Sequence, residues 1–180
     1  MVETDLFSLP GFHIRLLQPE DTLLLQALLE NCADYSLLVT GHAPAPSAAA
    51  SLLADCPPGK TRRDKRSIGL FTQQQELIGV LDAVRGYPAA DAWWLGLLLL
   101  DPAQRGQGLG QRVYQAFEAW AGQQGAAGIL LGVVDANQAA FRFWQRLGFE
   151  VVERRPARQI GEGMHEVLTM ARPVTPHPKL

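Results

Sequence analysis

The sequence predicts one mixed α/β domain, in which a sheet of antiparallel and parallel strands carries helices on both faces. Three observations support this fold class. The chain has 180 residues, about the length of a single domain. Its first half contains strand patterns joined as a hairpin, and its second half alternates apolar strands with amphipathic helices. Hairpins make antiparallel pairs and crossover helices make parallel pairs, so the two halves together require a mixed sheet.

The first half of the chain shows a strand followed by two helices. Residues 12–16 alternate apolar and polar side chains, which is the period of a strand. Pro19 stands at a favourable first helical position, and the leucines after it recur at helical spacing, so we expect a helix that ends near Cys32. Prolines interrupt the pattern over residues 33–59, where we expect only a short helix at 47–53.

The rest of the chain alternates strands and helices. Residues 67–72 and 77–85 are strand-like on either side of a polar turn and predict a hairpin. The run 93–100 is almost continuously apolar, which is typical of a strand covered on both faces. After it we expect a helix, a strand, a helix and two closing antiparallel strands, over residues 109–121, 129–134, 137–147, 151–155 and 165–171.

Composition narrows the class of protein. The chain has 16 Lys and Arg against 18 Asp and Glu, whereas general nucleic-acid binders usually carry a basic excess, so we expect no nucleic-acid partner. Its two cysteines form neither a disulfide framework nor a zinc-site spacing, so we expect no metal. With no signal-peptide pattern and no apolar run of about 18 residues, we expect a cytoplasmic protein with no membrane partner. The basic run 60–66 predicts a solvated loop or a docking site for an acidic substrate. We expect one domain over 1–180, with a loose arm at 1–11 and a tail at 173–180.

The most informative segment runs from the apolar strand through a glycine-rich turn into a helix. It reads Arg105-Gly106-Gln107-Gly108-Leu109-Gly110. Free N–H groups and the positive end of the helix dipole meet at such a helix start, which suits a phosphate, and glycines let the anion approach the backbone closely. The loop lacks the Lys-Ser/Thr pair of a Walker loop, and Gln111 replaces the third glycine of a dinucleotide fingerprint.

Two blocks of the second half form a wider pattern. The first is Arg105-x-x-Gly108-x-Gly110, and the second begins at Asn137 as Asn-Gln-Ala-Ala-Phe-Arg-Phe-Trp-Gln-Arg-Leu-Gly-Phe. They resemble the Arg/Gln-x-x-Gly-x-Gly/Ala signature and the Asn-x-x-Ala-x-x-hydrophobic-Tyr-x-x-x-Gly-Phe block of the GNAT superfamily of N-acetyltransferases. The strong resemblance covers residues 93–155. It implies a curved mixed sheet of about seven strands with helices on both faces.

The resemblance implies that acetyl-CoA is the acyl donor and that the loop amides hold its pyrophosphate. It also implies that the Asn137 side chain contacts the pantetheine arm and that the following helix flanks the thiol. The positions implied for acetyl-CoA are Leu98, Leu99, Leu100, Arg105, Gly106, Gln107, Gly108, Leu109, Gly110, Asn137, Phe141 and Trp144.

The implied reaction is direct attack of an amine on the acetyl carbonyl in a ternary complex, without an acyl-enzyme. A free backbone amide of residues 98–100 would hold the carbonyl oxygen. Keeping an amine of pKa about 10.4 neutral at pH 7 costs roughly 4.6 kcal/mol, whereas a leaving thiolate of pKa about 8.5 needs only about 2 kcal/mol of help. A general base therefore matters more than an acid, and Asp91 and Asp82, near and within the strands of this region, are the candidate bases.

The sequence departs from the superfamily pattern at the acid. Trp144 stands where Tyr is usual, and an indole N–H does not give up its proton near neutral pH. Tyr35 and Trp93 are the candidate residues of an acceptor pocket. We expect the acceptor to be an amine of a small molecule or of a protein, and we expect a possible homodimer through the C-terminal strands with Trp120 or Trp94.

Two other functions fit the same sequence. A non-catalytic acyl-CoA-binding module would keep the loop and have lost its acid at Trp144, and it would release no free thiol when amines are supplied. A nucleotide-binding protein would use the loop for another phosphate and would prefer a nucleotide over coenzyme A.

Overall fold

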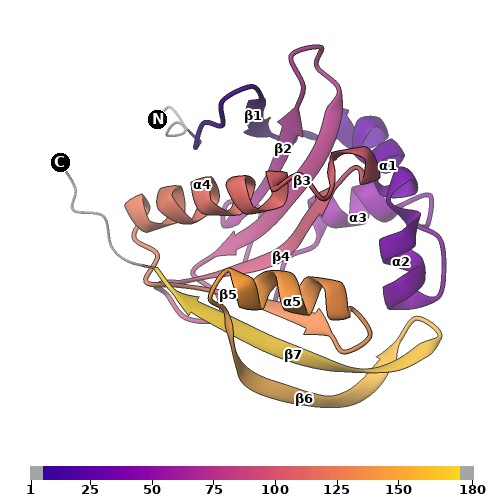
Figure 1. Cartoon of the computed structure of the whole chain (residues 1–180), viewed down its shortest axis with the longest axis vertical. Helices are drawn as coiled ribbons and strands as arrows, with labels where there is room; N and C mark the ends of the chain where they lie inside the picture. The colour runs from indigo at the N-terminus through magenta and orange to yellow at the C-terminus, as the bar shows by residue number, and fades with distance from the viewer. Residues whose placement is uncertain (1–5, 175–180) are drawn as a thin grey trace.

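A seven-stranded sheet forms the frame of the protein, whose computed structural model describes residues 6–174 (Figure 1). The strands lie in the order β1-β2-β3-β4-β5-β7-β6. Every neighbouring pair is antiparallel except β4 and β5, which are parallel. Their bounds are β1 (His13–Leu16), β2 (Lys65–Phe71), β3 (Leu77–Arg85), β4 (Ala92–Leu100), β5 (Gly128–Val134), β6 (Glu150–Ile160) and β7 (Gly163–Pro173).

Helices cover both faces of this sheet, the first three on one face and the last two on the other (Figure 1). Their bounds are α1 (Thr22–Asn31), α2 (Ala33–Thr40), α3 (Ala48–Ala54), α4 (Leu109–Gln123) and α5 (Gln138–Arg146), with 3-10 turns η1 (Pro19–Asp21) and η2 (Pro102–Gln104). The predicted mixed sheet with helices on both faces is confirmed. None of the helices in the described part of the chain combines the length and the apolar character needed to cross a bilayer.

Helix α2 is an element that the sequence did not predict. It follows α1 after the single residue Cys32, and it ends at Gly41, whose φ of 79° lies in the left-handed region. Leu37 and Leu38 of α2 are exposed, so no apolar period distinguishes this helix from the irregular segment expected there. Its importance is positional, because α2 forms a wall of the candidate site described below.

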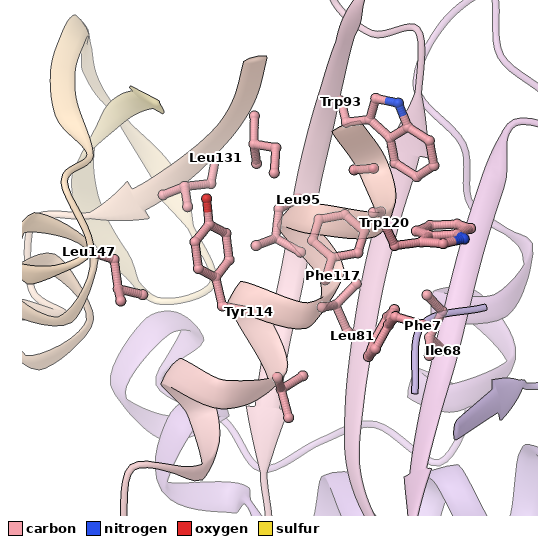
Figure 2. Close-up of a cluster of buried hydrophobic side chains, with 14 of the residues drawn as sticks. Phe7, Ile68, Leu81, Trp93, Leu95, Tyr114, Phe117, Trp120, Leu131 and Leu147 are labelled. Atoms are coloured by element: carbon pink, nitrogen blue, oxygen red, sulfur yellow. The ribbon is translucent and has the colours of Figure 1, made fainter. Parts of the chain in front are cut away.

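An aromatic cluster fills the space between the sheet and α4 (Figure 2). Trp93 of β4 packs edge-on against Phe117 and Trp120 of α4, with ring centroids 5.8 and 5.3 Å apart. Phe7 adds a ring 6.4 Å from Phe117, and Leu9 is buried in the same cluster. The N-terminal segment expected as a loose arm is therefore anchored at these two residues. Trp120 is a core residue rather than the surface residue that an interface would need.

The C-terminal strand extends farther than predicted. β7 includes Pro173, and the Val174 N–H donates to the carbonyl oxygen of Ala127 at 2.9 Å. These two residues thus belong to the folded domain rather than to the tail predicted at 173–180. The rest of that tail, and residues 1–5 of the predicted arm, lie outside the described residues.

Strands β4 and β5 separate partway along their length. Their ladder ends at the pair Leu95 and Leu131, although both strands continue. On its other edge β4 carries a bulge, since the register with β3 shifts between Asp82 and Ala83 and leaves Gly96 without a partner. A bulge bends its strand, which carries the end of β4 away from β5. The result is a wedge-shaped opening in the middle of the sheet.

Candidate active site

The glycine loop borders a cavity of about 370 Å³ at the N-terminus of α4. Gly106 and Gly108 have φ angles of 77° and 78°, which glycine adopts without strain. A Cβ atom on either glycine would meet no atom within 4 Å, so the loop surface is open. Gly108 is also the N-cap of α4 and brings no side chain to the first N–H groups of the helix. These N–H groups and the helix dipole would favour an anion in the cavity.

Arg105, which the sequence singled out, lines this loop cavity but is already paired with another side chain. The Arg105 guanidinium donates to the Asp34 carboxylate at 2.5 and 3.2 Å, and its Nε donates to the Leu100 carbonyl oxygen at 2.8 Å. All three of its nitrogens are thus engaged. Its hydrogen bonds lower the pKa of Asp34, and they tie the loop to α2. Gln111 and Arg146 also line the loop cavity, and neither was predicted.

The wedge between β4 and β5 holds a second cavity, of about 130 Å³. It is lined by Leu95, Gly96, Leu97 and Leu98 of β4, Leu131, Gly132, Val133 and Val134 of β5, Tyr35 and Val39 of α2, and Asn137, Ala140 and Trp144 beside or within α5. Leu98 lines the loop cavity as well, so the two cavities adjoin. Beyond Leu95 the edge of β4 has no β5 partner, which leaves backbone N–H and C=O groups for a ligand.

The structure brings together most of the residues implied for acetyl-CoA. Around the loop cavity lie Leu98, Leu100, Arg105, Gly106, Gly108 and Gly110. Asn137 and Trp144 border the wedge, and Asn137 Oδ1 also accepts the Ala140 N–H at 3.0 Å as the cap of α5. Four of the positions implied for acetyl-CoA line neither cavity, namely Leu99, Gln107, Leu109 and Phe141.

Aromatic packing fixes Trp144 at the border of the wedge. Its ring lies 5.4 Å from that of Tyr114 and 5.2 Å from that of Phe149. The Tyr114 hydroxyl donates to Glu118 Oε1 at 2.8 Å, and burial raises the pKa of Tyr114. Neither aromatic residue is therefore suited to deliver a proton. Tyr35, one of the two predicted acceptor-pocket residues, does line the wedge, and burial raises its pKa too.

Asp82 lies directly behind the wedge. It is 5% exposed, and its carboxylate accepts hydrogen bonds from Lys65 Nζ at 2.8 Å and Ser67 Oγ at 2.5 Å. A Cβ on Gly96 would lie 3.6 Å from Asp82 Oδ2, so the carboxylate is next to this glycine, which lines the wedge, although Asp82 itself does not line it. Burial raises the pKa of Asp82, and the bonds from Lys65 and Ser67 offset part of the rise. Lys65 is thus a buried partner, although the sequence placed it in a solvated or docking run.

The other two predicted residues near β4 lie away from the wedge. Asp91 is exposed at the start of β4, at the opposite end of the strand from the glycine loop. Trp93 is buried under α4 and lines neither cavity (Figure 2). Trp94 points to the other face, where its ring would lie 3.4 Å from a Cβ placed on Gly132. The tryptophan beside the wedge is therefore Trp94.

The tip of the β6–β7 hairpin meets the end of α2 (Figure 1). The Glu162 N–H donates to the Thr40 carbonyl oxygen at 2.9 Å, and Glu162 Oε1 lies 3.5 Å from His42 Nε2. A side chain on Gly161 would overlap Thr40, so this contact needs glycine. Nearer the base of the hairpin, the Arg155 guanidinium lies 6.0 Å from the centre of the Trp94 ring. The hairpin and α2 thus form a bridge on the α2 side of the wedge.

Comparison with known sequences places this geometry in a family. Residues 34–149 match the model of the acetyltransferase (GNAT) family. The chain belongs to this family. A search of curated proteins finds no relative of the chain.

Solved structures of acetyltransferases share the GNAT fold of this chain. An acetyltransferase from Thermus thermophilus is 28% identical, with a TM-score of 0.71 over 91% of this chain and 97% of that one. The spermidine N-acetyltransferase from Vibrio cholerae, solved with CoA and spermine, is 14% identical, with a TM-score of 0.72 over 93% and 98% of the chains. The ribosomal-protein-S18-alanine N-acetyltransferase from Escherichia coli is 18% identical, with a TM-score of 0.67 over 94% and 98%.

Proposed function

We propose that the protein is an N-acetyltransferase that moves an acetyl group from acetyl-CoA directly to an amine in a ternary complex. The observation that carries the proposal is the pair of adjoining cavities. An anion site at the glycine loop leads past Leu98 into a narrow wedge that reaches from α5 to α2. A donor with an anionic end and a thin arm suits this path, and an acceptor can meet the arm from the α2 side.

The chain offers groups for each part of such a donor. The amides of the glycine loop and of the α4 start, together with Arg146, suit the pyrophosphate. Asn137 and Trp144 border the region proposed for the pantetheine arm. When bound, acetyl-CoA supplies an activated acetyl thioester. The unpaired edge of β4 beyond Leu95 offers a backbone N–H to the developing oxyanion, an interaction typically worth about 3 kcal/mol.

Asp82 is the proposed general base. A water in the gap at Gly96 can carry the proton of the acceptor amine to its carboxylate, as a general base acting through one water requires. The raised pKa of Asp82 makes it a stronger base than an exposed aspartate, and the nearby Lys65 ammonium opposes full neutralisation of the carboxyl. Asp91, the other candidate, is far along β4 and exposed, so it serves as a control rather than as the base.

The leaving thiolate needs less help than the amine. Trp144 offers no titratable proton, so the thiolate takes its proton from water or leaves as the anion. With a thiol pKa of about 8.5, this costs only about 2 kcal/mol at pH 7.

The acceptor is proposed to be an amine of a small molecule or of a protein. Two acetyltransferases with this fold are named for their acceptors, the polyamine spermidine and an alanine of a ribosomal protein, so the fold serves both classes. In this chain Tyr35 of α2 lines the wedge and Trp94 lies beside Gly132 of the wedge, which gives the acceptor aromatic neighbours. Aromatic faces attract an ammonium group before it loses its proton.

Amine-dependent release of free thiol from acetyl-CoA tests the proposal. The wild type is assayed with a panel of primary amines and amine-bearing peptides, and the acetylated product is identified by mass. We expect release that depends on the amine, and a loss in kcat of about 100-fold or more in Asp82→Asn. Asp91→Asn, the matched control, should keep wild-type kcat.

Two outcomes would favour the other functions. Binding of acetyl-CoA without thiol release under any amine would point to an acyl-CoA-binding module, which the tryptophan at position 144 makes the second candidate. Preference for a nucleotide over coenzyme A in competition binding would point to a different phosphate ligand.

Asp82→Asn leaves Lys65 buried without its partner, so the neutral double variant Asp82→Asn/Lys65→Met serves as a second folded reference.

A further inference from the structure

Asp82 lies between two cavities. On one side is the wedge, reached past Gly96. On the other side is a separate cavity of about 180 Å³ between the ends of β1 and β2, lined by Leu16, Leu17, Gln18, Leu53, Arg62, Lys65 and Ser67. Lys65 and Ser67 both line this second cavity and both donate to Asp82. The three side chains therefore form a hydrogen-bonded partition between the wedge and the second cavity, which we call the exit cavity.

The exit cavity suits water more than it suits an apolar ligand. Gln18, Arg62, Lys65 and Ser67 supply polar groups, and Gln18 and Arg62 are exposed, so the cavity communicates with solvent. Buried water needs several polar partners of this kind. The Lys65 ammonium also donates to the carbonyl oxygen of Asp55 at 2.9 Å, which holds it in place.

We propose that the Ser67 hydroxyl relays to the exit cavity the proton that Asp82 takes from the acceptor amine. This inference rests on the proposed function. A base that acts once per turnover must lose its proton before the next one, and as long as donor and acceptor fill the wedge the proton has no way out through it. The exit cavity offers a path that avoids both substrates. Ser67 is thus a positioning and relay residue that acts through Asp82.

One proton moves from the acceptor amine to solvent in the proposed relay. The protonated acceptor amine gives its proton through water to Asp82, which becomes a neutral carboxylic acid. A half-turn of the carboxyl group about its Cβ–Cγ bond exchanges the two oxygens and presents the acid proton to Ser67 Oγ. The Ser67 oxygen then accepts this proton while its own hydroxyl proton passes to a water of the exit cavity. Asp82 returns to the carboxylate, Ser67 is unchanged, and one proton has left for solvent.

Ser67 suits this relay better than Lys65. A hydroxyl accepts one proton while it donates another, whereas an ammonium group only donates. Lys65 instead keeps the Asp82 carboxylate charged between turnovers by its ion pair at 2.8 Å. Among the described residues, the charged groups that face Asp82 and the exit cavity are Lys65 of β2 and Arg62 of the loop before it, while β4 offers Gly96 and Leu97.

The test compares Ser67→Ala with Ser67→Thr across a pH profile of kcat. Ser67→Ala removes a hydrogen bond that lowers the pKa of Asp82, so a purely structural role moves the acid limb of the profile to higher pH and leaves the plateau unchanged. A relay also lowers the plateau, and we expect a loss of about tenfold or more with both KM values unchanged. Ser67→Thr keeps the hydroxyl and should restore the plateau. A Ser67→Ala plateau within twofold of wild type would overturn the relay.

A second variant tests the exit cavity without touching the partition. Gln18→Trp places a large ring at the exposed rim of the cavity, and Gln74→Trp, on the exposed turn between β2 and β3, is its matched control. We expect Gln18→Trp to lower the plateau of kcat and Gln74→Trp to leave it unchanged. Equal plateaus in the two variants would overturn an exit through this cavity. Failure of the relay leaves amine-dependent thiol release in the wild type intact, whereas failure of the proposed function abolishes it, so the two failures are distinguishable.

Discussion

The variant Gly108→Glu tests the glycine loop as the site of acetyl-CoA. The new carboxylate enters the loop cavity at the N-cap of α4, where the pyrophosphate is proposed to bind. No atom lies within 4 Å of the added Cβ, so the substitution adds charge and bulk without a clash. Its cost to the fold is backbone strain at a φ of 78°, about 1–2 kcal/mol for a residue other than glycine.

The size of the effect follows from ligand linkage. At 100 times its Kd, acetyl-CoA stabilises the wild type by about 2.7 kcal/mol. In a chain of this length 1 kcal/mol corresponds to about 2–4 °C, so the wild-type Tm should rise by about 5–11 °C. In the variant the carboxylate repels the phosphates and fills their place, so the ligand-induced rise should vanish at the same concentration.

Gly125→Glu is the matched control for thermal unfolding with and without acetyl-CoA. Gly125 has a φ of 90°, and a Cβ there also meets nothing within 4 Å, but it lies just after α4, at the end opposite to the loop. Both variants should therefore lose about 2–8 °C of ligand-free Tm through strain. Only Gly125→Glu should keep the full rise with ligand. A full rise in Gly108→Glu would refute the assignment of the loop.

Three further predictions concern single side chains. Arg146→Ala should raise the KM for acetyl-CoA about tenfold or more and leave kcat unchanged, because a charge-assisted hydrogen bond is worth about 1.5–3 kcal/mol; an unchanged KM would remove this residue from the site. Trp93→Ala should cost about 3–5 kcal/mol in urea unfolding, whereas Trp94→Ala should mainly raise the acceptor KM; the reverse pattern would contradict the assigned faces. Hydrogen bonds from Arg15 lower the pKa of Asp21, so the stability that this pair adds is complete above the unfolded pKa of about 4 and disappears as the pH falls through the folded value. The Tm difference between wild type and Arg15→Met should therefore shrink below about pH 4, and a constant difference would contradict this.

The main strands and helices of the fold were predictable because buried side chains recur in the sequence at the spacing of a strand or of a helix. The apolar run of β4 and the amphipathic pattern of α4 are both visible without coordinates. Helix α2 was not predictable, because Leu37 and Leu38 face solvent and no apolar stripe marks it. The separation of β4 from β5 has no sequence period either, since it depends on the register of the bulge at Gly96.

The candidate site was predictable where its chemistry is local. Gly106 and Gly108 have the left-handed backbone conformation that favours glycine, and the glycine-rich pattern of this loop is visible in the sequence. The sequence places Lys65 in a run expected to be a solvated loop or a docking site, because only the pairing of β2 with β3 brings this lysine to Asp82. Because β4 is apolar along almost its whole length, no alternation in the sequence shows which of Trp93 and Trp94 faces α4, and the structure buries the predicted pocket residue Trp93 there.

Helical spacing also predicts the position of Arg146, a cavity residue that the sequence analysis does not single out. Arg146 lies one helical turn beyond Phe143, and both line the loop cavity. Once α5 is expected to flank the glycine loop, helical spacing alone would have placed the arginine beside the proposed phosphates.

The bridge between the hairpin tip and α2 joins two segments that contribute little to the main core. Most of β6 is exposed, and α2 contains no fully buried residue, so their exposed positions, unlike Gly161, tolerate substitution at little cost in stability. Together they border the α2 side of the wedge, whereas Asp82, Lys65 and Ser67 behind Gly96 are buried side chains of the central strands. If the proposed function holds, substitutions in these two segments change the acceptor side of the wedge while the proposed base and the glycine loop stay unchanged. Diversification of substrates within one lineage is the evolutionary consequence of this division.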